Sequence, residues 1–105
     1  MKWTILWSSF AEKQIAGIHS FYIDEASPKV AKKITQGLIK APSILLKNPK
    51  LGQIEPSLID LKIEYRYILY KTYKIVYRLN MENRQIRVVD VFNTRQNPKK
   101  LKRNK

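Results

Sequence analysis

From residue 63 onward, apolar side chains recur at every second position in three consecutive runs. The runs cover residues 63–70, 73–79 and 86–92. A period of two is typical of β-strands, because successive side chains point to opposite faces of a sheet. The connections, Lys71-Thr72 and residues 81–84, are too short for a crossover between parallel strands. The pattern therefore predicts a three-stranded antiparallel meander.

The third run differs from the other two because it is apolar at consecutive positions. Val88, Val89 and Val91 surround a single acidic residue, Asp90. Apolar side chains on both faces are typical of a strand that is covered on each side. We therefore expect this strand to lie inside the sheet and not at its edge.

The N-terminal half begins with a short strand pattern and then changes to a helical period. Trp3, Ile5 and Trp7 alternate with polar or smaller residues, which indicates a strand. Ser9 and Glu12 have the spacing of a capping box, in which each side chain bonds the backbone of the other residue. Apolar residues at helical spacing follow, so we predict a helix from here to about residue 23.

A second helix start lies close behind the first helix. Ser27 precedes Pro28, an N-cap followed by proline at the first helical position. Only residues 24–26 separate the two helices, which favours an antiparallel hairpin. Pro42 should end or kink the second helix, and residues 47–57 read as a loop. The sequence predicts an α+β fold, with the hairpin packed on one face of the meander.

The composition is that of one small globular domain. A chain of 105 residues with 44% apolar side chains can form a single core. We expect that domain over residues 1–98, followed by a basic C-terminal tail over residues 99–105. No apolar run approaches the roughly 18 residues of a membrane span, and the N-terminus lacks a signal-peptide pattern. A cytoplasmic location is therefore expected.

The positive charge is concentrated in the second half. The formal net charge is +13, and residues 62–105 carry 13 basic and three acidic side chains. A surplus of this kind attracts a nucleic acid or an acidic protein through long-range electrostatic steering. The alternative is a solubilising tail that binds nothing in particular.

Residue types needed for several kinds of chemistry are missing. The chain has no cysteine, one histidine (His19) and three glycines, without a glycine-rich phosphate loop. We therefore expect no metal and no cofactor. What remains is a basic and aromatic sheet, which could bind phosphates and stack on bases, or could place its tyrosines in the core. Its cations are Arg66, Lys74, Arg78, Arg87 and Arg95, and its tyrosines are Tyr65, Tyr67, Tyr70, Tyr73 and Tyr77.

Three segments together resemble the RelE/ParE superfamily, the toxins of type II toxin–antitoxin pairs. They are Gly52-Gln53-Ile54-Glu55-Pro56, Tyr73-Lys74-Ile75-Val76-Tyr77, and an apolar strand from Ile86 that ends near Arg95. With the opening strand and helical hairpin, the resemblance covers about residues 2–98. It implies a role in growth arrest or plasmid stabilisation, with a cognate acidic antitoxin as partner. An acidic antitoxin segment suits the basic second half of the chain.

The resemblance leaves the target open. In the messenger-RNA-cleaving RelE- and YoeB-like branch, Glu55 falls near the general base, Lys74 at the scissile phosphate and Arg95 at the end of the last strand. That chemistry also needs an acid at the leaving oxygen. The branch usually carries a Tyr or His after the last strand, and residues 93–105 contain neither. Lys99, Lys100 or a strand tyrosine would have to substitute.

The sequence therefore leaves three alternative hypotheses for the function. The first is a ribosome-dependent messenger-RNA endoribonuclease with Glu55, Lys74 and Arg95 as catalytic residues, and it is the preferred hypothesis. The second is a ParE-like inhibitor of DNA gyrase without catalytic activity. The third is an inactive domain that binds nucleic acid or antitoxin. The residues expected to contact RNA or antitoxin are Arg66, Lys71, Tyr73, Arg78, Arg87, Lys99 and Lys100.

Overall fold

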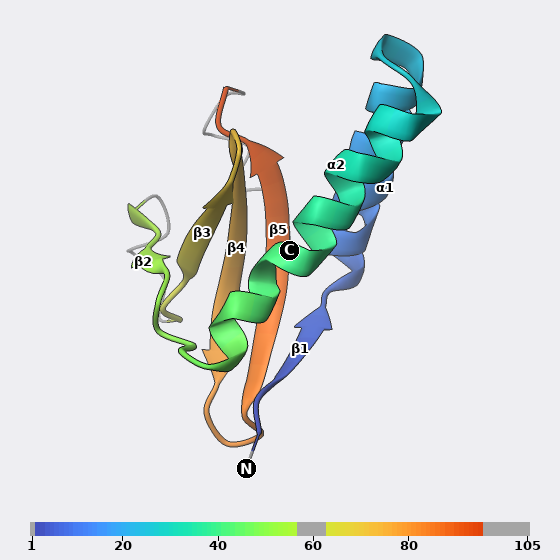
Figure 1. The fold of residues 1–105 in the computed structure, drawn as a ribbon. Coiled ribbons are helices and arrows are strands. Elements are labelled where there is room, and N and C mark those ends of the chain that lie inside the picture. Colours follow the sequence, from blue (N-terminus) through green and yellow to red (C-terminus); the bar gives the residue numbers. More distant parts are fainter. Residues whose placement is uncertain (1, 57–62, 96–105) are drawn as a thin grey trace.

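The computed structural model describes residues 2–56 and 63–95. Its elements form an α+β fold, as predicted (Figure 1). In chain order they are β1 (Thr4–Trp7), α1 (Ser9–Glu25), α2 (Pro28–Lys40), the 3-10 helix η1 (Ala41–Leu46), β2 (Gln53–Ile54), β3 (Arg66–Tyr70), β4 (Tyr73–Asn80) and β5 (Gln85–Asn93).

The predicted meander is present, but it is part of a wider sheet. Strands β3, β4 and β5 pair antiparallel in sequence order. The full order is β1-β5-β4-β3-β2, with β1 parallel to β5 and β2 antiparallel to β3. Trp7 pairs with Val88, far away in the sequence. This pairing makes β5 an interior strand, and Val88, Val89 and Val91 are buried as expected.

Both helices begin at a serine cap, although the first cap lies one residue earlier than predicted. Ser8 retains an extended backbone after β1, and its Oγ accepts a hydrogen bond from the Ala11 N–H at 3.0 Å. Ser9 is already the first helical residue, so the Ser9–Glu12 capping box was wrong in register. Ser27 caps α2 as predicted, accepting from the Val30 N–H at 3.2 Å.

The boundaries around the loop also differ from the sequence pattern. Helix α2 ends at Lys40, and the chain continues through Pro42 as a tighter 3-10 helix, so the proline does mark a break. The predicted loop over residues 47–57 contains β2, a two-residue strand that the sequence did not indicate. The alternation from Ile63 becomes a strand only at Arg66.

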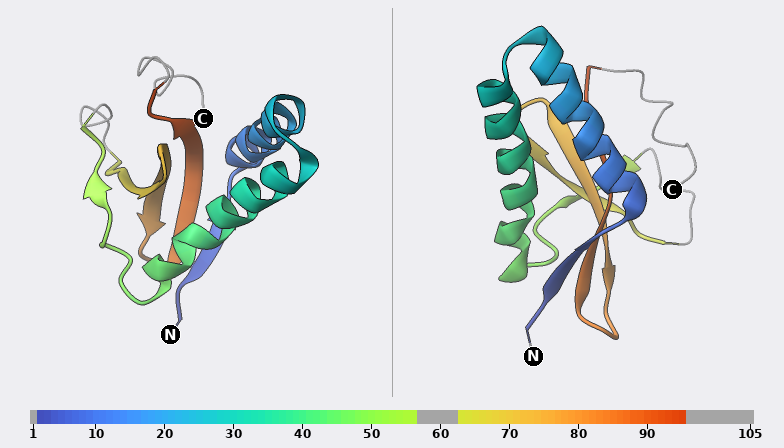
Figure 2. Two further views of the ribbon diagram at one scale, coloured as in Figure 1. Left: turned by 45° about the horizontal axis from the view of Figure 1, so that its top comes forward. Right: turned by 90° about the vertical axis from the view of Figure 1, so that its right-hand side faces the viewer.

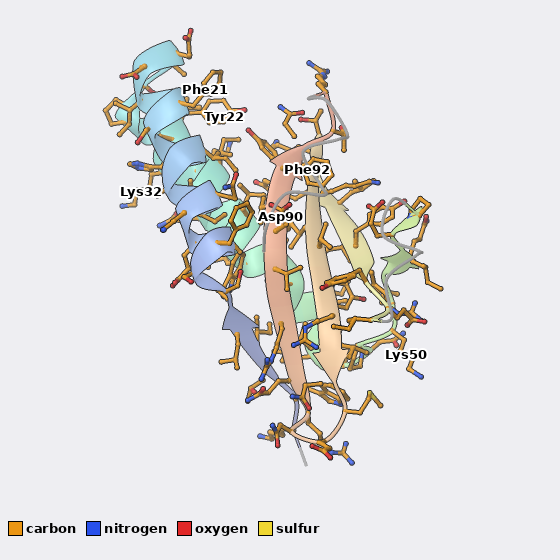
Figure 3. The ribbon with its side chains drawn as sticks, turned by 180° about the vertical axis from the view of Figure 1, so that it is seen from behind. Phe21, Tyr22, Lys32, Lys50, Asp90 and Phe92 are labelled. Carbon is orange, nitrogen blue, oxygen red and sulfur yellow. The ribbon has the colours of Figure 1, made fainter. Side chains whose placement is uncertain are left out.

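The molecule has a helical layer on one face of the sheet. Figures 1 and 2 show α1 and α2 side by side, running antiparallel against it, as the hairpin prediction required. Between the layers lies the main core, which includes Leu38, Ile75, Tyr77 and Val88. We call the other face of β3–β5 the outer face, and no helix of the described chain covers it (Figure 3).

The outer face has a small apolar cluster of its own. Val76, Val89 and Phe92 are buried there, with Tyr65 and Tyr67 packed against them. A register shift lies between Val76, which pairs with Asp90, and Tyr77, which pairs with Val88. Val89 is therefore the extra residue of a β-bulge. The bulge bends β5 where the two clusters lie back to back.

Candidate functional site

Side-chain alternation along β4 separates the predicted site residues between the two faces of the sheet. Tyr73, Ile75 and Tyr77 belong to the main core under the helices. Successive strand residues point to opposite faces, so Lys74 and Arg78 lie on the outer face. Arg87 pairs with Arg78 across β4 and β5 and shares that face. Three of the predicted cations therefore lie on one surface.

Two of the three predicted catalytic residues contact each other. The Lys74 Nζ donates to the Glu55 Oε1 at 2.9 Å, which joins the end of β2 to β4. The same ammonium group lies 4.1 Å from the centre of the Tyr67 ring, a cation–π contact. Only 2% of the Glu55 side chain is exposed, against 21% of the Lys74 side chain. The sequence could not show that this carboxylate is buried and paired.

The remaining pair of outer-face cations lines a separate depression, which we call the arginine hollow. Arg78 and Arg87 stand opposite each other on it, together with Leu6, Trp7, Tyr65 and Val89, around a volume of about 380 Å³. The Arg87 guanidinium bonds Gln85 Oε1 at 3.0 Å from Nη2. Lys74 does not line this depression, so the cations of the outer face do not converge on one place.

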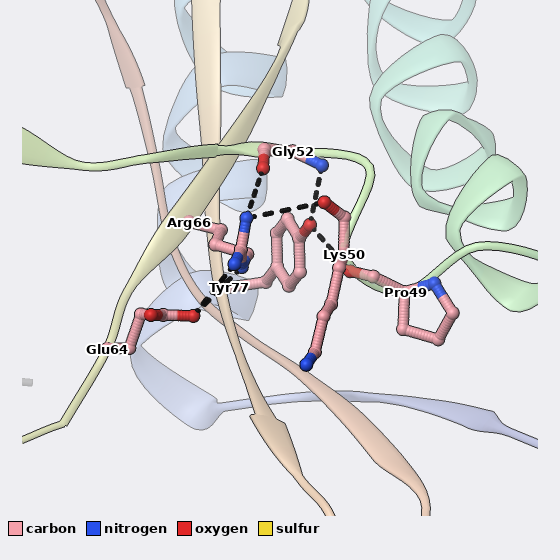
Figure 4. Close-up of polar contacts among 6 residues, drawn as sticks. All are labelled: Pro49, Lys50, Gly52, Glu64, Arg66 and Tyr77. Atoms are coloured by element: carbon pink, nitrogen blue, oxygen red, sulfur yellow. Dashed lines mark hydrogen bonds and ion pairs between the residues drawn. The ribbon is translucent and has the colours of Figure 1, made fainter.

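Arg66 points to the helical side of the sheet, where it holds the loop before β2 (Figure 4). Its Nη1 donates to the carbonyl oxygens of Gly52 at 2.8 Å and Lys50 at 3.3 Å, and Glu64 pairs with its Nη2 at 3.0 Å. Its guanidinium is thus engaged within the chain. Whether it also contacts RNA or antitoxin stays a prediction.

Tyr77 also holds the loop before β2, from the core side of the sheet, through contacts that the sequence analysis did not predict. Its hydroxyl donates to the Pro49 carbonyl at 2.8 Å and accepts from the Gly52 N–H at 2.9 Å (Figure 4). A Cβ at Gly52 would lie 2.5 Å from that hydroxyl, so only glycine fits. Burial raises the pKa of Tyr77, against the opposing hydrogen bond from Gly52. The only sequence signals of this contact were that Tyr77 alternates along its strand and that Gly52 lies in a predicted loop.

The other predicted contact residues are dispersed. Tyr73 lies in the core, where its hydroxyl donates to that of Tyr22 at 3.2 Å and burial raises its pKa. Lys71 is exposed in the β3–β4 turn with a positive φ of 53°. Arg95 is exposed just beyond β5, and no described contact joins it to Glu55 or Lys74. Lys99, Lys100 and the 99–105 tail lie outside the described residues.

Within residues 2–56 and 63–95, His, Asp and Glu side chains form no group of three that could hold a metal ion. In the same ranges, neither helix has the length and apolar character needed to cross a membrane. What the described site offers is positive charge beside a depression on the outer face of the sheet.

Comparisons with known proteins agree with this architecture. A solved structure described as "Chromosomal ParDE TA system from P. aeruginosa" aligns with a TM-score of 0.71, covering 87% of this chain and 95% of that one. Its sequence is 16% identical, so the likeness concerns the fold. No curated protein matches the sequence. A family model for the ParE toxin of the type II toxin–antitoxin system parDE matches residues 5–98, and the chain therefore belongs to the ParE toxin family.

Proposed function

We propose that this chain is the toxin of a type II toxin–antitoxin pair and that it arrests growth by binding DNA gyrase, without cutting RNA itself. Gyrase inhibition is the activity associated with the ParE branch of the superfamily. The proposal includes a cytoplasmic location and a cognate antitoxin as partner. The observation that carries it is that the Glu55 carboxylate is buried and paired with Lys74.

A general base must be able to reach the proton that it removes. Glu55 is 2% exposed, and its carboxylate is paired with Lys74 at 2.9 Å. The pair neutralises the lysine as well, so neither side chain is presented to a 2′-hydroxyl or to a scissile phosphate. These contacts support a structural role in which Glu55 and Lys74 fasten β2 to β4.

The other two parts of the RNase chemistry are also not assembled. Arg95 has no described contact with the Glu55–Lys74 pair. Residues 93–105 contain no Tyr or His to protonate a leaving oxygen. A toxin that acts by binding needs no such set, because electrostatic complementarity to its target orients and speeds the association.

Two reactions with the purified chain test the proposal. We expect it to inhibit supercoiling by purified gyrase and to leave messenger RNA intact on programmed ribosomes. Codon-edge cleavage that disappears in Arg95→Ala would instead establish the endoribonuclease. Absence of both effects, with no growth defect on expression, would favour the inactive binding domain.

The Glu55–Lys74 pair gives a separate test through stability. Lys74→Met should lower the free energy of unfolding by about 2–3 kcal/mol, because a buried carboxylate loses its charged partner. Glu64→Gln is the control, because it removes only an exposed carboxylate that pairs with Arg66. It should lower the free energy of unfolding by less than about 0.5 kcal/mol. Glu55→Gln should retain gyrase inhibition at the same toxin concentration. Loss of inhibition in a folded Glu55→Gln protein would contradict the structural role.

A further inference from the structure

A second hollow, of about 280 Å³, lies between α1 and the end of β5, and we call it the α1–β5 hollow. It shares no described lining residue with the arginine hollow. Ile18 and Phe21 on α1, and Val91 and Phe92 on β5, form its apolar walls. Figure 3 shows Phe21 and Phe92 at the same end of the molecule, one on the helix and one on the strand.

Three polar side chains reach the same hollow: those of Gln14, Tyr73 and Asn93. Tyr73 is only 4% exposed, and its hydroxyl donates to the Tyr22 hydroxyl at 3.2 Å. The Asn93 Oδ1 accepts from the Arg95 N–H at 3.0 Å, which fixes the orientation of the amide. None of the described lining residues carries a charge. Apolar walls with a few polar groups suit a neutral ligand that has a hydrogen-bonding edge.

The lining side chains favour a purine base as that ligand. The Phe21 and Phe92 rings offer apolar faces and edges for a flat ring, and aromatic side chains stack on bases. The amide groups of Gln14 and Asn93 each combine a donor with an acceptor, which is the pattern that binds N6 and N7 of adenine. The volume suits one ring system, since sites for whole drug-sized ligands occupy about 300–1,000 Å³.

Two exposed cations lie just beyond the hollow. Tyr73 pairs with Asn93, and Thr94 then bonds the Thr72 carbonyl at 2.8 Å through both its N–H and its hydroxyl. This pairing brings together two exposed residues that follow the strand ends, Lys71 and Arg95. Each lies two residues from the hollow along its strand, which is roughly 7 Å. A phosphate attached to the bound base would lie near both cations.

The backbone of Lys71 is in a conformation that a lysine seldom adopts. Its φ of 53° lies in the left-handed region, which glycine enters without steric cost. Two-residue turns between antiparallel strands usually place glycine or asparagine at such a position. Strained backbone at other residue types clusters where the side chain has a function. The turn thus retains a cation where glycine would be more favourable.

We propose that the α1–β5 hollow binds an adenine nucleotide, with the base against Phe21 and Phe92 and the phosphate at Lys71 and Arg95. A single nucleotide fits better than a strand, because the hollow has room for one base and one pair of cations lies beside it. Single-stranded nucleic acid is bound by a series of both. The inference goes beyond the proposed function and does not depend on gyrase as the target.

Gly17 allows the hollow to be filled without disturbing the fold. It lines the hollow, and a Cβ at this position would meet no atom within 4 Å. Gly17→Leu should abolish the binding of adenosine monophosphate, measured by isothermal titration calorimetry with the purified chain. It should not lower the melting temperature, because leucine has a higher helix propensity than glycine. Ala16→Leu is the matched control, since Ala16 is exposed beside it and lines a different depression.

The control Ala16→Leu should bind the nucleotide like the parent. Unchanged affinity in folded Gly17→Leu would overturn the assignment of the hollow. Absence of binding to the parent chain at millimolar adenosine monophosphate would overturn the site altogether.

The cations are tested by comparing the nucleotide with adenosine, which has no phosphate. Lys71→Gln and Arg95→Gln should each weaken the binding of adenosine monophosphate about tenfold, the loss of a charge-assisted contact. The affinity for adenosine should stay unchanged in both variants. Arg84→Gln is the control, because Arg84 is an exposed cation with a φ of 51° in the turn at the other end of β4 and β5. Equal weakening in Arg84→Gln would overturn the proposal in favour of unspecific attraction.

Two further ligands test the choice of ligand. Uridine monophosphate should bind more weakly than adenosine monophosphate, and equal binding would overturn the assignment of adenine. Tighter binding of an oligodeoxyadenylate, per nucleotide, would overturn the choice of a free nucleotide.

Stability supplies an independent readout of the turn. Lys71→Gly should raise the melting temperature, because glycine relieves the strained backbone, and should weaken the binding of adenosine monophosphate. A lower melting temperature would contradict a cation kept at the cost of strain. The gyrase assay remains separate: failure of inhibition with intact nucleotide binding contradicts only the proposed function. Intact inhibition without nucleotide binding contradicts only this inference.

Discussion

At the scale of single residues, a few buried polar groups determine where the loop before β2 lies. The Tyr77 hydroxyl bonds both Pro49 and Gly52, and Arg66 bonds the Gly52 carbonyl from the neighbouring strand. Buried backbone groups of an irregular segment must find such partners, because an unpaired group costs about 1–3 kcal/mol. The loop in turn carries Glu55 to Lys74. A hydroxyl on the core side thus positions a carboxylate on the outer face.

Removing that hydroxyl should be costly although the ring remains. Tyr77→Phe leaves the Pro49 carbonyl and the Gly52 N–H without their partner, so we expect a loss of about 1–3 kcal/mol in the free energy of unfolding. Urea denaturation followed by circular dichroism measures it. Tyr70→Phe is the control, since no hydrogen bond is described for its hydroxyl; an equal loss there would contradict the specific role of Tyr77.

The raised pKa values of Tyr73 and Tyr77 predict alkaline sensitivity. Burial raises the pKa of both groups in the folded chain. In the unfolded chain they ionise near pH 10. Above that pH the unfolded state binds fewer protons than the native state, so the free energy of unfolding falls as the pH rises. Below pH 10 the contribution is fully present.

Urea denaturation at pH values from about 8 to about 11 tests this dependence around the tyrosine pKa. We expect a flat profile up to about pH 10 and a decline above it. The decline should be shallower in Tyr77→Phe, which has one fewer buried phenol to ionise. Parallel profiles for the two proteins would show that ionisation of Tyr77 does not contribute to the decline.

At the scale of elements, the change from β1 to α1 is set by backbone conformation. Ser8 has φ −67° and ψ 156°, which continues the strand, while its Oγ already caps the helix. Its N–H also bonds the Val88 carbonyl at 2.9 Å. The pairing of β1 with β5 therefore determines which of two consecutive serines serves as the cap.

The two serines give a matched pair of substitutions. Ser8→Ala should lower the free energy of unfolding by about 1 kcal/mol, because the Ala11 N–H loses its acceptor. Ser9→Ala should be within about 0.5 kcal/mol of the parent, since Ala has a higher helix propensity than Ser. Thermal denaturation of both variants decides the register of the cap. The opposite order would restore the Ser9 assignment.

At the scale of the whole molecule, the first strand joins the two halves of the chain. Strand β1 pairs with β5, and Trp3, Ile5 and Trp7 pack against the main core. Helix α1 packs against the same core through Ile15 and Ile18. The helical layer and the sheet therefore share one set of buried contacts, and neither should be stable without the other.

This shared core predicts a single unfolding transition. Circular dichroism at 222 nm follows mainly the helices, whereas tryptophan fluorescence follows β1, since Trp7 lies in that strand and Trp3 lies directly before it. We expect the two urea curves to coincide, as in two-state unfolding. Loss of the fluorescence signal at lower urea would show that β1 detaches before the rest of the fold.

Periodicity alone identified most of the elements. The two-residue period from Ile63 to Phe92 led to three strands, of which the first begins only at Arg66, and Ser27-Pro28 located the second helix. Strand β2 was missed because two residues are too few for a period, and its pairing partner lies on β3. For the site, the basic strands were visible in the sequence. The burial of Glu55 and the opposition of Arg78 to Arg87 were not.

The sequence by itself determined the kind of each long element, because local hydrophobic spacing and turn residues act within a few positions of one another. It also determined the strongly basic character of the second half. Only the tertiary structure decided that β1 joins β5, that Lys74 neutralises Glu55 and that two arginines face each other. These contacts depend on strand register and on the bulge at Val89, which place distant residues together and leave no periodic trace along the chain.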